Sequence, residues 1–234
     1  SKFSWPIKNI KIFNEKNKFK ELFSFKNKDK YLFFLVRNKS FLSFLEKNLK
    51  RNKNFSKKII NKSFNYNRLL QEQNNIIINS DSKNILSKKY FSKRIKKDYN
   101  SKAITTIINH QVNRNDCAYQ VFTKFGPLAF LPYSKNKTSV VFSLNNSSKE
   151  IPDYKIKSII SKYNNFYKLK SFSIFEKFNL DLSISKNYYY KNILGFSDNL
   201  HKIHPLAGQG FNMTLRDIKI LGDIIDQRLE LGLP

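Results

Sequence analysis

The chain has 234 residues, and 40% of them are hydrophobic, including 22 Phe and 12 Tyr. This aromatic content excludes a disordered polypeptide and suffices for one large domain or two small ones. The 44 Lys and Arg against 17 Asp and Glu give a formal charge of +27, which is typical of proteins that bind nucleic acid or anionic membranes. The basic residues are scattered rather than gathered in one stripe, which argues against nucleic acid. A codon bias toward A and T is an alternative cause of the charge.

The single cysteine, Cys117, excludes an intrachain disulfide and favours a reducing compartment. The longest apolar runs, such as residues 31–36, are far shorter than the roughly 20 residues of a membrane-spanning helix. We therefore expect a cytoplasmic protein that is soluble or peripheral on the inner face of the cytoplasmic membrane. A catalytic role for Cys117 would need a positioned His, and nothing in the sequence places one. We expect a buried small residue there.

The first elements in chain order follow from short bursts of apolar residues. Alternation over residues 5–25 predicts two strands of a hairpin, and residues 31–36 predict a further strand. An apolar stripe at helical spacing over residues 41–49 predicts a helix, with Asn38 or Ser40 as its N-cap.

The next part of the chain is polar and basic. Residues 59–64 and 76–78 predict strands around a polar connector, and residues 79–84 predict a turn. Residues 88–97 are strongly basic, and we interpret them as a solvated surface helix or loop. Contact with anionic phospholipid headgroups is the alternative for this segment.

The central part of the chain is rich in strands. Residues 103–110, 118–131 and 138–144 predict an antiparallel sheet. Residues 152–163 then follow a helical pattern, and residues 172–184 return to a strand.

The last part of the chain contains a glycine loop. Residues 188–196 form an aromatic and apolar run, and apolar residues recur at helical spacing from Phe211 to Leu229. Between them, Gly208 and Gly210 allow the backbone to approach a flat or negative ligand closely, and the first N–H groups of the following helix would point at it. The pattern predicts a ligand-binding loop.

Two stretches resemble a known family. Asp198, followed by residues 201–212 (His-Lys-Ile-His-Pro-Leu-Ala-Gly-Gln-Gly-Phe-Asn) and by Leu-Arg-Asp at 215–217, resembles the second flavin-binding motif of the ubiquinone-biosynthesis hydroxylases. These are FAD-dependent aromatic-ring monooxygenases of the p-hydroxybenzoate hydroxylase superfamily. Residues 125–132 (Phe-Gly-Pro-Leu-Ala-Phe-Leu-Pro) resemble another segment of the family, with His110 upstream in matching spacing.

The resemblance implies a set of FAD-binding residues. Asp198 would bind the ribityl chain, Pro205 would lie beside the isoalloxazine ring, and the backbone from Gly208 to Asn212 would face its pyrimidine end. The full set that we expect to bind FAD is Arg37, Asp81, Asp198, Pro205, Leu206, Ala207, Gly208, Gln209, Gly210, Phe211 and Asn212. A solvated charge at a strand end is the alternative for Arg37, and a turn former is the alternative for Asp81. We expect no catalytic acid, base or nucleophile.

The chain departs from the family pattern at three places. Ser197 stands where the family has Gly before the Asp, and Ser82 stands where the family has the Gly of its Asp-Gly motif, next to Asp81. All six glycines lie at or after Gly126, so a G-x-G-x-x-G fingerprint for the FAD pyrophosphate cannot occur in the first 125 residues. We therefore interpret the chain as an internal piece of a longer enzyme.

A metal site is the other chemistry that the histidines suggest. His201 and His204 are three residues apart, and His110 is the third histidine. A zinc site would need further ligands, and no Cys or Glu cluster lies nearby. We expect no metal.

The predicted fold is mixed α/β, in which an antiparallel substrate sheet accompanies part of an FAD domain. We expect a substrate-domain hairpin at 1–30, FAD-domain portions at 31–98 and 187–234, and the substrate sheet at 99–186. By resemblance, the enzyme hydroxylates a polyprenylated phenol with O₂ through a flavin C4a-hydroperoxide, and NAD(P)H donates the electrons. An anionic membrane surface and other ubiquinone-biosynthesis enzymes are candidate partners. The alternative is a basic protein that binds nucleic acid or membranes on a degenerate flavoenzyme fold, without catalysis.

Overall fold

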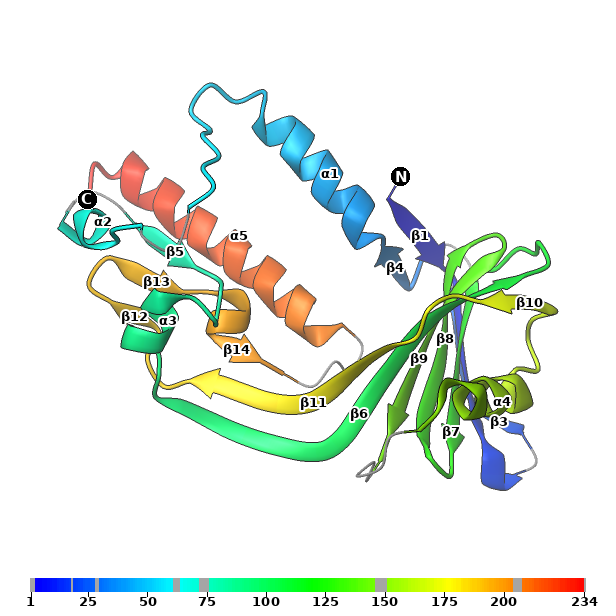
Figure 1. The fold of residues 1–234 in the computed structure, drawn as a ribbon. Helices are drawn as coiled ribbons and strands as arrows, with labels where there is room; N and C mark the ends of the chain where they lie inside the picture. Colours follow the sequence, from blue (N-terminus) through cyan, green and yellow to red (C-terminus); the bar gives the residue numbers. More distant parts are fainter. Residues whose placement is uncertain are drawn as a thin grey trace. The chain divides into compact units, whose positions relative to one another are not determined.

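The computed structural model describes residues 3–17, 19–27, 30–60, 64–71, 76–145, 151–203 and 208–233. The chain divides into two compact units, drawn as a ribbon in Figure 1. Unit 1 comprises Ser1–Lys58 and Asn100–Asn179, and unit 2 comprises Ile59–Tyr99 and Leu180–Pro234. The mixed α/β class that the sequence predicted is confirmed. None of the helices in the described ranges has the length and apolar composition that crossing a bilayer requires.

Unit 1 is built on a large sheet whose strands follow the order β6-β9-β8-β7-β2-β3. Its strands are β2 (Asn9–Asn14), β3 (Lys20–Lys26), β6 (Arg94–His110), β7 (Cys117–Thr123), β8 (Gly126–Ser134), β9 (Lys137–Leu144) and β10 (Leu169–Phe172), which pairs with β6. Its neighbours pair antiparallel except for β2 and β7, which run parallel. The antiparallel sheet predicted over 103–144 is therefore confirmed, and the parallel pairing of β7 with β2 makes the complete sheet mixed.

The core of unit 1 lies between this sheet and one helix, α4 (Asp153–Tyr163). Along β8, side chains alternate between buried and partly exposed, as a strand with one covered face requires. Leu128 and Phe130 of β8 are fully buried, and so are Ile156 and Tyr163 of α4. Figure 1 shows α4 against the sheet, and the helix predicted over 152–163 is confirmed.

The hairpin predicted within residues 5–25 is confirmed, and one further strand precedes it. The hairpin is formed by β2 and β3, with the short turn η1 (Glu15–Asn17) between them, whereas β1 (Ser4–Ile7) pairs antiparallel with β4 (Phe33–Val36). The helix α1 (Asn38–Leu49) follows β4, and its N-cap is Arg37. The prediction of Asn38 or Ser40 as the N-cap was therefore wrong. Contacts such as that of Phe3 with Phe41, whose ring centroids are 5.3 Å apart, place residues 31–58 in unit 1, although the sequence had grouped 31–98 together.

Unit 2 contains a three-stranded sheet in the order β12-β13-β5. Its elements are α2 (Asn67–Gln71), β5 (Ile77–Asn79), α3 (Ile85–Tyr90), the carboxyl end of β11 (Glu176–Ser185), β12 (Tyr189–Tyr190), β13 (Ile193–Gly195), η2 (Ser197–Asn199), β14 (His201–Lys202) and α5 (Gln209–Glu230). Leu86, Phe91 and Ile193 form its small core. β14 pairs antiparallel with β11, and β6 and β11 both run from one unit into the other.

Three predicted elements differ from the structure. The strand predicted over 59–64 is absent from its described residues, because Ile59, Ile60 and Phe64 have irregular backbone. Ile59 is 95% exposed, so no packing stabilises a strand there. Residues 61–63 lie outside the described residues. The basic segment 88–97 is not a solvated helix or loop throughout, because β6 begins at Arg94. The strand predicted over 172–184 is interrupted, since β10 ends at Phe172 and β11 begins at Glu176.

Candidate functional site

Two parallel strands end side by side in unit 2. β5 and β13 pair in parallel, with Ile77 opposite Ile193 and Asn79 opposite Gly195. The segment carrying Asp81 follows β5, and η2 with Asp198 follows β13. Ligands of open α/β sheets bind outside the carboxyl ends of the strands. The structure therefore brings the Asp81 and Asp198 turns to the same edge of the sheet.

Two buried asparagines hold these turns to each other. The backbone carbonyl of Asn79 accepts hydrogen bonds from the N–H of Phe196 at 3.0 Å and from Nδ2 of Asn199 at 3.1 Å. The side chain of Asn79 donates to Oγ of Ser87 at 2.9 Å and accepts from Asn84. Asn84 also caps α3 by accepting the N–H of Ser87. The sequence identified neither Asn79 nor Asn199 as a site residue, because isolated asparagines in a polar turn carry no distinguishing signal.

Arg94 supports the Asp198 turn from the other side. Its Nη1 donates to the carbonyl of Asn199 at 2.7 Å, its Nε donates to Oγ of Ser183 at 2.7 Å, and its Nη2 contacts the carbonyl of Ser183 at 3.3 Å. Burial lowers the pKa of Arg94. The guanidinium thus joins β6, β11 and η2.

The turn that carries Asp198 is tight. Ser197 has φ +50°, which lies in the left-handed region where glycine has no steric penalty. This is the position at which the family pattern has Gly, so the substitution retains the turn conformation but adds strain. The hydroxyls of Ser197 and Thr214 lie 3.2 Å apart, which connects the turn to α5. Asp198 itself is exposed, so its carboxylate can accept hydrogen bonds from a ligand.

The N-terminus of α5 presents bare backbone. Gly208 is the N-cap and has φ +69°. Among the described residues, a Cβ built on Gly208 would meet no heavy atom within 4 Å, and one on Gly210 would meet only Cγ1 of Ile203, at 3.8 Å. The N–H groups of a helix's first turn have no acceptor within the helix and carry partial positive charge. The predicted residues Pro205, Leu206 and Ala207, together with His204, lie outside the described residues.

A histidine and a carboxylate connect the two ends of the glycine loop. Nε2 of His201, on β14 before the loop, lies 3.2 Å from Oδ2 of Asp217, on α5 after it. The side chain of His201 is only 11% exposed. The spacing of His201 and His204 suggested a metal site as one alternative, and the structure shows His201 paired with Asp217. The third histidine, His110, is buried in unit 1 and bonds to Thr138 and to the carbonyl of Gln111.

Arg37 and Asp81 have identifiable local roles. Oδ1 of Asp81 accepts the N–H of Lys83 at 2.8 Å, which is the hydrogen bond of a turn former. Arg37 lies in unit 1, where its guanidinium carbon is 5.9 Å from the ring centroid of Tyr133. Asp81 therefore lies at the same strand edge as Asp198, while Arg37 belongs to the other unit.

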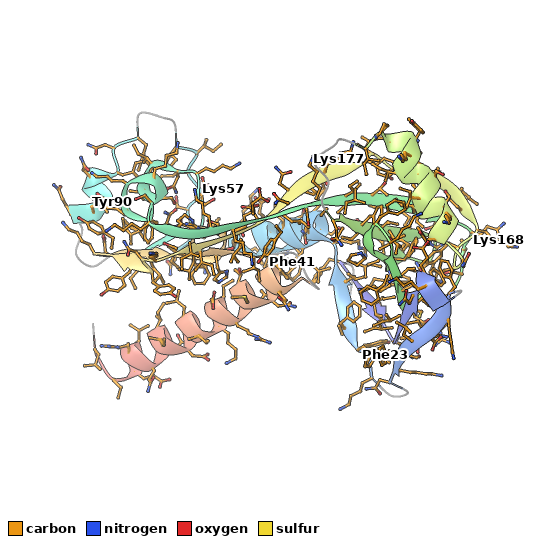
Figure 2. The ribbon with its side chains drawn as sticks, turned by 90° about the horizontal axis from the view of Figure 1, so that it is seen from below. Phe23, Phe41, Lys57, Tyr90, Lys168 and Lys177 are labelled. Atoms are coloured by element: carbon orange, nitrogen blue, oxygen red, sulfur yellow. The ribbon has the colours of Figure 1, made fainter. Side chains whose placement is uncertain are left out.

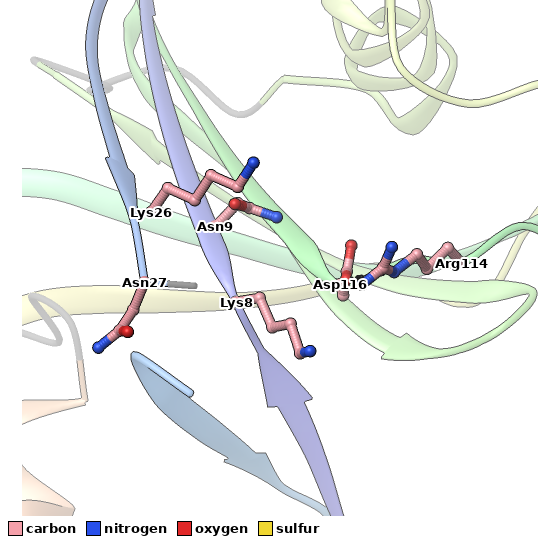
Figure 3. A pocket seen from close by; sticks show the side chains of 6 residues that line it. All are labelled: Lys8, Asn9, Lys26, Asn27, Arg114 and Asp116. Atoms are coloured by element: carbon pink, nitrogen blue, oxygen red, sulfur yellow. Dashed lines mark ion pairs between the residues drawn. The ribbon is translucent and has the colours of Figure 1, made fainter. Parts of the chain in front are cut away.

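A polar hollow in unit 1 is separate from these residues. Figure 3 shows its lining, which consists of Lys8, Asn9, Lys26, Asn27, Arg114 and Asp116. Nε of Arg114 pairs with Oδ2 of Asp116 at 2.6 Å. None of the predicted site residues lines this hollow, and its polar walls do not suit an aromatic ring.

The site in unit 2 fits the flavin end of FAD. The exposed carboxylate of Asp198 suits sugar-like hydroxyls, and the bare backbone at Gly208 and Gly210 leaves room for a flat ring at a positively polarised helix end. Oδ1 of Asn199 is buried and has no hydrogen-bond partner among the described residues. A hydrogen-bond donor of a ligand beside this turn would satisfy it.

Comparisons with curated proteins agree with this chemistry. No protein-family model matches the chain. The chain is 25% identical over 207 residues to the ubiquinone biosynthesis monooxygenase COQ6 of Dictyostelium discoideum, over 67% of this chain and 42% of that protein. It is 26% identical over 141 residues to the ubiquinone hydroxylase UbiL of Rhodospirillum rubrum, over 58% of this chain and 33% of that protein. The chain thus spans less than half the length of these relatives.

Solved structures share the fold at low sequence identity. The chain matches pqsL, a probable FAD-dependent monooxygenase from Pseudomonas aeruginosa, with a TM-score of 0.67 and 13% identity, over 97% of this chain and 70% of that one. It matches the flavin-dependent halogenase CmlS with a TM-score of 0.70 and 12% identity, over 98% of this chain and 47% of that one. Together with the motif from Asp198 to Asn212, these comparisons show that the chain is similar to ubiquinone-biosynthesis hydroxylases and that it has the fold of FAD-dependent monooxygenases.

Proposed function

We propose that the chain forms the flavin-ring site and the substrate sheet of an FAD-dependent monooxygenase that hydroxylates a polyprenylated phenol in ubiquinone biosynthesis. The observation that carries the proposal is the Asp198 turn and the α5 N-terminus, built at the edge where β5 and β13 end in parallel. The relatives COQ6 and UbiL, which are named for ubiquinone biosynthesis and ubiquinone hydroxylation, support the pathway.

Each residue of the site has a proposed task. Asp198 accepts hydrogen bonds from the ribityl hydroxyls, and the backbone from Gly208 to Asn212 faces the pyrimidine end of the ring. Pro205, Leu206 and Ala207 line the ring by the family motif, and Asp81 and Arg37 contact the cofactor from their own segments. FAD supplies the oxygen chemistry when it is bound. The side chains bind, orient and exclude water, and no side-chain acid, base or nucleophile is assigned.

The units divide the work in this proposal. The residues that face the flavin ring belong to unit 2, and unit 1 carries the sheet that the family resemblance assigns to the substrate. O₂ is the co-substrate and NAD(P)H the electron donor. The substrate's polyprenyl tail resides in a lipid bilayer, so the protein meets an anionic membrane surface from the inside of the cell, where other ubiquinone-biosynthesis enzymes are candidate partners.

The test uses the full-length protein that contains this chain. We expect it to purify with FAD, or to bind added FAD at one per chain, as measured by flavin absorbance after removal of free cofactor. We further expect NAD(P)H- and O₂-dependent addition of one hydroxyl to a short-chain polyprenylphenol, detected by mass spectrometry. A full-length protein that binds no FAD after reconstitution would contradict the proposal and would favour the non-catalytic binding protein.

A further inference from the structure

Four tyrosines gather on one surface of unit 2. Tyr188, Tyr189 and Tyr190 are 59%, 71% and 38% exposed, and Tyr90 ends α3 beside them. The rings of Tyr90 and Tyr190 are stacked, with centroids 4.1 Å apart and planes at 13°. Figure 1 shows α3 and β12 at the same end of this unit, and Figure 2 labels Tyr90. We call these four tyrosines, together with Lys89, Lys93, Lys186 and Lys191, the tyrosine–lysine surface.

The scaffold beneath these tyrosines is well packed. Ile193, which pairs with Tyr190 across the hairpin of β12 and β13, is fully buried, and Phe91, next to Tyr90, is 1% exposed. The carbonyl of Tyr188 accepts the N–H of Gly195 at 2.7 Å. Because the backbone is held in this way, the exposed rings are a fixed feature of the surface.

Positive charge surrounds the rings. Nζ of Lys89 lies 5.2 Å from the ring centroid of Tyr90, and Nζ of Lys191 lies 5.9 Å from that of Tyr190. The N–H of Lys186 bonds to the carbonyl of Lys93 at 2.8 Å, so these two basic residues adjoin as well. Residues 82–97 and 186–196, which build the surface, carry nine Lys and Arg and no Asp or Glu. Positive charge therefore predominates on these segments, and the nearest carboxylates in sequence, Asp81 and Asp98, lie directly outside residues 82–97.

We propose that the tyrosine–lysine surface docks on an anionic lipid bilayer. Tyrosine rings favour the interface between headgroups and acyl chains, and lysines extend their ammonium groups to lipid phosphates. Single-stranded nucleic acid would instead require open ring faces for base stacking, and in the stacked pair each of Tyr90 and Tyr190 covers one face of the other. The inference rests on the proposed function in one respect, because that function gives the protein a reason to bind a membrane. Docking itself requires neither flavin nor substrate.

The experiment measures co-sedimentation of the full-length protein with vesicles of phosphatidylcholine, with and without phosphatidylglycerol, at increasing salt. The test variants are Tyr189→Ser and the double variant Lys89→Gln/Lys191→Gln. The matched controls lie in α4 of unit 1: Tyr154→Ser, where Tyr154 is 74% exposed, and Lys155→Gln/Lys157→Gln, where both lysines are exposed. Each control removes the same side chains and charge from a different surface. Flavin content is recorded for every protein.

We expect parent binding to require phosphatidylglycerol and to weaken steeply with salt. Since each surface lysine contributes about fivefold to affinity for anionic lipid, the double lysine variant should bind more than about tenfold more weakly, while the controls bind like the parent. Equal binding by the test variants and the parent would overturn the proposal. Tighter binding of the parent to single-stranded DNA than to vesicles, lost in Tyr189→Ser, would also overturn it and assign the surface to nucleic acid. Absence of flavin in the parent would contradict the proposed function and leave the vesicle result unchanged.

Discussion

The guanidinium of Arg94 donates a hydrogen bond of 2.7 Å to the backbone carbonyl of Asn199, the residue after the carboxylate that the family motif assigns to FAD. Nδ2 of the same Asn199 bonds to the carbonyl of Asn79 at the end of β5. The Asp198 turn is therefore fixed from two sides. Its geometry is set by buried polar contacts before any cofactor contributes.

Replacement of Arg94 should loosen this turn. Arg94→Gln removes the charged donor at Asn199 and Ser183, so we expect a loss of about 1.5–3 kcal/mol in the free energy of unfolding and weaker FAD binding. Urea titration and a flavin-binding isotherm measure the two effects. The control is Lys96→Gln, an exposed residue on the same strand. An FAD dissociation constant equal to that of the parent would show that Arg94 supports the fold alone.

The pair of His201 and Asp217 should couple the strand before the glycine loop to the helix after it. In a double-mutant cycle of His201→Phe and Asp217→Asn, we expect a coupling energy of about 0.5–3 kcal/mol in the free energy of unfolding, because the two side chains are in contact. The control cycle combines His201→Phe with Asp223→Asn, whose carboxylate pairs with Lys219 on the same helix. Strictly additive effects in the first cycle would rule out the coupling.

Two glycines should respond oppositely to the same substitution. A Cβ at Gly126, where φ is +132°, would lie 2.0 Å from the carbonyl oxygen of Ser143, so Gly126→Ala should destabilise unit 1 by more than about 2 kcal/mol. Gly222 lies within α5, and a Cβ there meets no heavy atom of the described residues within 4 Å. Gly222→Ala should therefore stabilise the protein by about 0.5–1 kcal/mol. Thermal unfolding measures both changes in stability. An unchanged unfolding temperature for Gly126→Ala would contradict the close approach of Gly126 to the carbonyl of Ser143.

Cys117 should be a slow nucleophile. Burial raises the pKa of its thiol, and the thiolate is the reactive form. We expect iodoacetamide to label Cys117 more slowly in the native protein than in urea at pH 8.5, as followed by peptide mass spectrometry. Because the unfolded thiol loses its proton first, its contribution to stability is present below its unfolded pKa of about 8.5 and declines as pH rises beyond it. Equal native and unfolded labelling rates would contradict this environment.

Local patterns allowed much of the fold to be predicted from the sequence. The alternation in β8 and the helical spacing in α4 correspond to elements with one covered face. The helical spacing in α5 corresponds to a helix as well, although none of its side chains is buried. The pairing of β1 with β4 was missed, because register between segments is not encoded in the periodicity of either one. The apolar pair at Ile59 and Ile60 was misread as a strand, since nothing in its own pattern shows that it lacks a partner.

The candidate site was likewise predictable from the sequence only in part. The glycine loop was recognisable because bare backbone is required at fixed positions, and Gly208 indeed has a left-handed conformation. Arg94 and Asn79 were not recognisable, because they reach Asn199 across 105 and 120 residues of sequence. Hydrogen bonds over such separations leave no local signal in a single sequence.

Asp198 should contribute to FAD affinity through one charged acceptor. Asp198→Ala should weaken FAD binding by about 1.5–3 kcal/mol, the cost of losing a hydrogen bond to a charged group. Because Asp198 is exposed, its removal should leave the free energy of unfolding nearly unchanged. A flavin-binding isotherm measures the first quantity and urea titration the second. Unchanged FAD affinity would remove Asp198 from the site.

The central claim is that the backbone at the N-terminus of α5 faces the flavin ring, and Gly210→Val tests it most directly. Among the described residues, the first carbon of the new side chain meets only Cγ1 of Ile203 at 3.8 Å, so the fold should accept it, whereas a ring lying on this backbone cannot. The control is Gly222→Val, the same change in open space on the same helix. The measurement is the FAD dissociation constant of the full-length protein. We predict that Gly210→Val loses FAD while Gly222→Val binds it like the parent. FAD bound as tightly by Gly210→Val as by the parent would contradict the account.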